Sequence, residues 1–103
     1  MAKIVKISRE EANRRLGDVP DDKRFWCQDG RVVKNLKELE EALNNMSDET
    51  FHYHSVEDRN DFSNWVGNVV GDTALANQLK RVMTSTAAAR KVEARITWLK
   101  ARL

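Results

Sequence analysis

One change of hydrophobic pattern divides this chain, and it falls in the segment FHYHSVEDRNDFSNWVGNVVG, residues 51–71. The alternation of apolar and polar residues predicts a strand over 50–55, with His52 and His54 on the same face. A polar loop over 56–60 follows, and Asp61 is placed to cap a helix. Apolar residues then recur at i, i+3, i+4, i+7 and i+8, the pattern of a helix that faces a core: Phe62, Trp65, Val66, Val69 and Val70.

The preceding segment predicts a β-hairpin followed by a helix. The pair Asp29-Gly30 separates two β-prone runs, RFWCQ over 24–28 and RVVK over 31–34. A two-residue Asp-Gly connection favours a primed turn with positive φ at both residues. Asn35 and Glu38 then form a capping box, and the apolar residues that follow lie on one helical stripe: Leu36, Leu39, Leu43 and Met46.

The order of these elements predicts an α+β fold. The helix after Asn35 is long enough for a crossover, so the strand over 50–55 is expected parallel to residues 31–34. Residues 3–7 are predicted as an edge strand, and Ser8 with Glu11 begins a short helix. The expected architecture is a small sheet, built from the β-hairpin plus one or two further strands, packed by about four helices with a long C-terminal helix.

The length of 103 residues predicts a single domain. Within it we distinguish an N-terminal strand and helix extension over 1–23 and an α+β core over 24–83. Helices are expected over 73–83, capped by Asp72, and from about residue 87 to the end. The C-terminal amphipathic basic helix, 86–103, completes the chain.

Composition and charge restrict the classes of protein. No apolar run approaches the roughly 20 residues of a membrane span, and the N-terminus has no signal-peptide pattern. Cys27 is the single cysteine, so we expect a cytoplasmic protein. The net charge is +2, but residues 80–103 contain seven basic residues and one acid, a net +6, against −4 for the rest. This segregation is able to steer binding partners.

Two stripes on the C-terminal helix are candidate binding surfaces. Basic and aromatic residues recur at i, i+4, i+7 and i+11, and they suit either phosphates and a stacked base or an acidic protein surface: Lys91, Arg95, Trp98 and Arg102. An apolar stripe beside it reaches the end of the chain and is compatible with a short twofold helix seam: Val92, Ile96, Leu99 and Leu103. Burial in the sheet of the same chain is the alternative.

Catalytic and metal-binding patterns are sparse. His52 and His54, at i and i+2 of a strand, are able to face one metal ion, but the sequence specifies no third ligand. We favour the interpretation that His54 bonds to the loop over 58–61 and orients the following helix. No nucleophile motif, phosphate-binding loop or cysteine pair is present, so we predict no catalytic residue, no metal and no cofactor.

Residues 25–79 resemble a conserved domain family of unknown function in archaeal and bacterial proteins. The resemblance rests on three segments: FWCQDGRVVKNLKELEEAL, TFHYHSVEDRNDFSNWV and VGDTALANQL. Their shared features are the FxxxDG hairpin, the NLxEL helix start, and the FHYH strand followed by NDFxxW. The resemblance implies an α+β fold, and it assigns no catalytic residue.

These observations predict a small non-catalytic binding or regulatory module that mediates protein–protein interaction, with either another protein or a second copy of itself as the partner. One alternative is a nucleic-acid-associated protein that uses the basic C-terminal helix. A second alternative is a metal-dependent enzyme that uses the strand with His52 and His54.

Overall fold

A computed structural model describes residues 6–56 and 58–103 of the chain. It confirms an α+β domain, with six α-helices and two small antiparallel sheets in the part it describes. In order, the elements are α1 (Arg9–Leu16), η1 (Asp21–Lys23), β1 (Phe25–Trp26), β2 (Val32–Val33), α2 (Leu36–Asn45), α3 (Asp48–His54), β3 (Ser55–Val56), β4 (Arg59–Asn60), α4 (Asp61–Trp65), η2 (Val66–Val70), α5 (Thr73–Leu79) and α6 (Ser85–Lys100).

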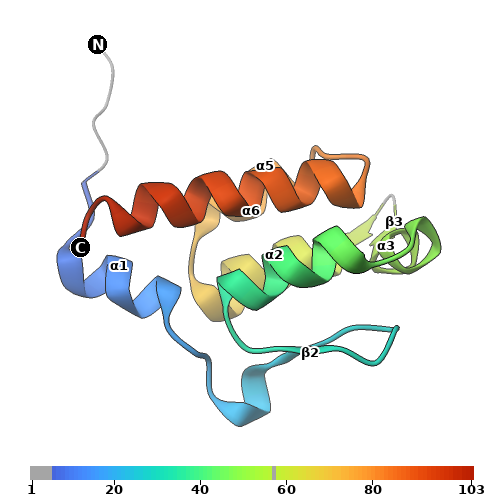
Figure 1. Cartoon of the computed structure of the whole chain (residues 1–103), viewed down its shortest axis with the longest axis horizontal. Helices are drawn as coiled ribbons and strands as arrows, with labels where there is room; N and C mark the ends of the chain where they lie inside the picture. Colours follow the sequence, from blue (N-terminus) through green and yellow to red (C-terminus); the bar gives the residue numbers. More distant parts are fainter. Residues whose placement is uncertain (1–5, 57) are drawn as a thin grey trace.

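The core forms between α2 and α6, which lie side by side in Figure 1. Leu36, Leu39 and Leu43 of the predicted stripe on α2 are fully buried. The facing side of α6 buries Val92 and Leu99 completely. The β1–β2 hairpin lies on the other side of α2, and α1 lies across the C-terminal end of α6 (Figure 1). Helix-on-helix packing, rather than a central sheet, therefore holds this domain together.

The first hairpin is confirmed, but its predicted turn is wrong. β1 and β2 pair through Phe25 opposite Val33, and the Gly30 N–H donates to the Cys27 carbonyl at 3.0 Å. The connection is thus a four-residue turn over 27–30, and Gly30 has φ of 99° whereas no described non-glycine residue has positive φ. One left-handed residue is enough for this longer loop, so Asp29 keeps ordinary backbone geometry.

The predicted strand over 50–55 is wrong, because residues 50–54 belong to α3 and only Ser55 is in a strand, β3. The Ser47 hydroxyl accepts a hydrogen bond from the Thr50 N–H at 3.1 Å and caps the helix, with Asp48 and Glu49 in its first turn. This cap outweighs the β propensity of the aromatic residues that follow. The buried positions 50, 51 and 54 follow the helical period rather than alternation. His52 and His54 therefore do not share a face.

The expected parallel pairing with residues 31–34 is also wrong. After α3 the chain makes a second hairpin, in which β3 pairs antiparallel with β4, and this sheet is separate from the β1–β2 sheet. The N-terminal strand predicted over 3–7 lies mostly outside the described residues, and Lys6 and Ile7 are in no regular element. α1 is confirmed, with the Ser8 hydroxyl accepting from the Glu11 N–H at 3.0 Å.

The helix predicted after residue 60 is confirmed with two differences. Asn60 rather than Asp61 caps α4, because its side-chain oxygen accepts from the Ser63 N–H at 2.9 Å. α4 then widens into the π-helical turn η2, which ends at Gly71 with φ of 84°. A Cβ at Gly67 would lie 3.3 Å from the Ala76 Cβ, so this glycine permits close packing of η2 against α5. α5 ends at Leu79, four residues earlier than predicted.

Candidate functional site

A groove of about 680 Å³ opens between α3, the β3–β4 hairpin, α4 and the α5–α6 connection. Its apolar lining comes from four residues of three separate segments: Phe51, Val56, Val82 and Met83. Its polar lining includes His52, Asp58, Arg59, Asn64 and Lys80. A concave site that combines an apolar floor with a few polar groups is typical of ligand and peptide sites.

The depth of the groove comes from Phe51, and its walls from side chains that remain exposed. The Phe51 ring is buried and stacks on Phe62, with ring centroids 5.5 Å apart. Val56 is 48% exposed and Met83 is 79% exposed. Large apolar side chains that are exposed together beside a concave surface indicate an interaction site.

Asn60 fixes the two walls of the groove relative to each other. Its side-chain amide donates to the Leu79 carbonyl at 3.2 Å, which ties the β3–β4 hairpin to the end of α5. Arg59 is anchored as well, because it donates to the Tyr53 carbonyl at 2.7 Å and pairs with the Asp61 carboxylate at 3.2 Å. Contacts within the chain therefore hold the two walls of the groove in place.

His54 lies beneath the groove as a structural residue. Its Nε2 accepts a hydrogen bond from the Gln28 N–H at 2.9 Å, so the proton is on Nδ1, which donates to the Asp61 carboxylate at 2.9 Å. The ring is buried and packs on Phe25 and Phe62. This agrees with the interpretation in which His54 orients the helix that follows. Through these contacts His54 links the first hairpin, α3 and α4.

Replacing His54 with alanine is expected to lower the free energy of unfolding by about 1–3 kcal/mol, because the Gln28 N–H and the Asp61 carboxylate lose a buried partner. His52 is exposed, so His52→Ala is the matched control and should change stability by less than about 0.5 kcal/mol. Urea denaturation measures both values. Equal effects of the two substitutions would contradict the assigned role of His54.

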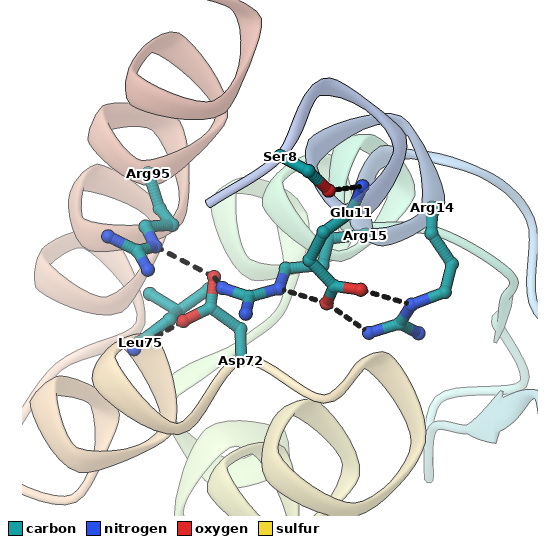
Figure 2. A network of polar contacts seen from close by, with 7 residues as sticks. All are labelled: Ser8, Glu11, Arg14, Arg15, Asp72, Leu75 and Arg95. Carbon is teal, nitrogen blue, oxygen red and sulfur yellow. Dashed lines mark hydrogen bonds and ion pairs between the residues drawn. The ribbon is translucent and has the colours of Figure 1, made fainter. Parts of the chain in front are cut away.

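The basic stripe on α6 is largely engaged inside the domain. The Arg95 Nε donates to the Asp72 carboxylate at 2.7 Å (Figure 2). The guanidinium carbons of Arg95 and Arg102 lie 3.9 and 3.5 Å from the centroid of the Trp98 ring. Two cations this close to one centroid must occupy opposite faces of the ring. Trp98 therefore has no free face on which a base can stack, and Lys91 is the exposed member of the stripe.

Asp72 is the centre of a charge network that joins three helices. It is fully buried, and one carboxylate oxygen accepts from the Leu75 N–H at 3.0 Å to cap α5. The other oxygen meets Arg95 of α6 and, at 3.5 Å, Arg15 of α1 (Figure 2). Arg15 continues to the Glu11 carboxylate at 2.7 Å. Arg95 of α6 and Arg15 of α1 thus join the two ends of the chain through a single buried acid.

Glu11 gives this network a pH dependence. Hydrogen bonds from Arg14 and then Arg15 lower the pKa of its carboxyl from 4.5 to about 2. A lowered folded-state pKa contributes stability above pH 4.5 that is lost as the pH falls toward 2. We expect the wild type to be more stable than Glu11→Gln above pH 4.5, and this difference in unfolding free energy to disappear as the pH falls toward 2. Urea denaturation at pH 2–6 measures it. A difference independent of pH would contradict the assignment.

The residues predicted as an association seam are mostly buried within the chain itself. Val92 and Leu99 are inaccessible to solvent, Ile96 is 6% exposed, and all three pack in the core that α6 shares with α2. Leu103, beyond the end of α6, is 50% exposed. The three buried side chains already have a partner surface in the same molecule, but that surface is α2 and not the sheet that the alternative named.

Within residues 6–56 and 58–103, no three His, Cys, Asp or Glu side chains are grouped to hold a metal ion. The Cys27 thiol is buried, and burial raises its pKa. None of the helices in the described part of the chain has the length and apolar character to cross a membrane.

Reasoning from sequence missed the groove. The helix predicted over 73–83 would include Met83, but α5 ends at Leu79 and leaves Met83 in solvent. Val56 and Lys80 are separated by 24 positions, and only the hairpin formed by β3 and β4 brings them to one groove.

Comparison with known proteins gives a family and no function. No curated protein and no solved structure matches this chain. A family model matches residues 20–99, the region that contains β1 to α6 and every residue of the groove. The match leaves α1 outside and spans well over half of the chain. The chain therefore belongs to DUF5752, a family of unknown function.

Proposed function

We propose that this domain is a non-catalytic protein-binding module and that it binds its partner in the groove between α3, the β3–β4 hairpin and the α5–α6 connection. The observation that carries the proposal is the pair Val56 and Met83, which stand 48% and 79% exposed on the groove wall. Exposed apolar side chains with polar neighbours, on a preformed concave surface, suit recognition of a protein.

The contacts of the other candidate residues support the same choice. A nucleic-acid partner would use a stripe in which Arg95 is bound to Asp72 and the ring of Trp98 is covered. A dimer seam along α6 would have to withdraw Val92 and Leu99 from the core. The nitrogens of His54 are both occupied by structural hydrogen bonds. We propose a cytoplasmic location for the module, because its single cysteine, Cys27, forms no disulfide.

Site-specific photo-crosslinking in the native host tests this proposal. A benzophenone amino acid replaces Met83 in the groove or, as the control, the exposed Lys100 on α6. We expect a discrete protein adduct from position 83 that is absent from position 100 and is lost when Val56→Asp is added. No adduct at position 83, or the same adducts at both positions, would contradict the proposal.

A further inference from the structure

We infer that the occupant of the groove is a short linear segment of a partner protein in which a bulky apolar side chain stands next to an acidic one. This inference rests on the proposed binding function and adds the chemistry of the occupant. Three observations carry it: the size of the groove, the distribution of its apolar side chains, and the charges at its α5–α6 end.

The size and lining of the groove suit a few side chains rather than a folded surface. A volume of about 680 Å³ lies within the range of roughly 300–1,000 Å³ that holds a small ligand or part of a peptide. The buried Phe51 and the half-buried Val82 form its depth, while Val56 and Met83 stand at its rim. Methionine adapts to different apolar shapes, so Met83 is able to close over a leucine or an aromatic ring.

The charges of the groove favour a carboxylate next to that apolar side chain. Among the described residues, Lys80 has no ion-pair partner, and its neighbour Arg81 is also exposed. The charge of Arg59 is compensated by Asp61. Asp58 is the one acid among the described residues of the lining. Lys80 and Arg81 thus place two exposed positive charges at the α5–α6 end of the groove, where they attract an anion.

The same features argue against a nucleic-acid strand as the occupant. A strand presents a phosphate at every nucleotide and needs several cations along its path, as well as aromatic faces for its bases. The groove has two lining cations, one of them paired, and an opposing carboxylate on Asp58. Lys80, the lining cation that has no ion-pair partner among residues 6–56 and 58–103, therefore fits one carboxylate of a peptide better than a run of phosphates.

Two fluorescein-labelled peptides test the inference by fluorescence anisotropy at low ionic strength. Both are acetylated and amidated and contain Leu-Phe, flanked on each side by two glutamates in one and by two lysines in the other. We expect the glutamate peptide to bind at least about tenfold more tightly. Lys80→Glu should weaken its binding about three- to tenfold, and Asp58→Asn should strengthen it about two- to threefold. Met83→Ser should weaken binding of either peptide.

The three substituted side chains are exposed, so each variant should keep the wild-type melting temperature within about 3 °C. Equal binding of both peptides, with loss in Met83→Ser, would overturn the acidic occupant and leave the groove as the binding site. Binding of neither peptide up to millimolar concentration would overturn the linear segment, while an adduct from position 83 would still support protein binding. Displacement of the glutamate peptide by a single-stranded oligonucleotide, abolished in Met83→Ser, would also overturn the inference.

Discussion

Asp72→Ala is expected to lower the free energy of unfolding by about 3–5 kcal/mol. The substitution leaves Arg95 and Arg15 without their buried partner. It also removes the carboxylate oxygen that accepts from the Leu75 N–H and caps α5. Removal of one member of a buried charge network is costly because the charges that remain are poorly solvated. Urea denaturation at pH 7 measures the loss.

Asp72→Asn is the matched control for this prediction. Asparagine keeps a side-chain oxygen for the Leu75 N–H but carries no charge, so the difference between the two variants isolates the cap from the ion pairs. We expect Asp72→Asn to lower the free energy of unfolding by about 1 kcal/mol less than Asp72→Ala does, because it keeps the cap but loses both ion pairs. If Asp72→Ala costs less than about 1 kcal/mol, the network is not a main support of the fold.

Leu99→Ala is expected to cost about 2–5 kcal/mol, because this side chain is inaccessible to solvent in the core shared by α2 and α6. Leu103→Ala removes the same atoms from a residue that is 50% exposed, and it should cost less than about 0.5 kcal/mol. Thermal and urea unfolding of both variants measures the contrast.

Removal of α6 tests more severely whether this helix belongs to the core of the single chain. A protein that ends at Ser85 lacks almost all of α6, so we expect it to lose cooperative unfolding and near-ultraviolet circular dichroism. A truncated chain that remains a folded monomer while the intact chain is a dimer would instead assign α6 to an intermolecular contact. Light scattering on the two chains distinguishes these results.

The elements predicted correctly from sequence are those fixed by local contacts. The stripe on α2 and the caps at Ser8, Asn35 and Asp72 all depend on residues three or four positions apart, and the structure confirms each of them. The position of the first hairpin is also local, since Asp29 and Gly30 interrupt two β-prone runs. The turn type predicted for this hairpin was wrong because Asp-Gly is compatible with both a two-residue loop and a longer one.

The failures occurred where two local signals competed or where tertiary contacts decided. Alternation over 51–55 was consistent with a strand, but Ser47 with Asp48 and Glu49 begins a helix, and the burial of Thr50 and His54 follows from packing. On α6 the sequence located the basic and apolar stripes correctly. It could not show that Arg95 faces a buried acid 23 positions away, which converts an apparent binding residue into a structural one.

Methyl spectra of protein labelled with [methyl-13C]methionine test the binding groove directly. Met83 is 79% exposed on the groove wall, whereas Met46 is 8% exposed in the core and reports on the fold in the same sample. We then add the glutamate-flanked peptide, or the partner protein identified by photo-crosslinking. We expect the Met83 methyl signal to shift and the Met46 signal to stay in place. Saturating binding that leaves the Met83 signal unmoved would show that the partner occupies another surface and would contradict the groove as the functional site.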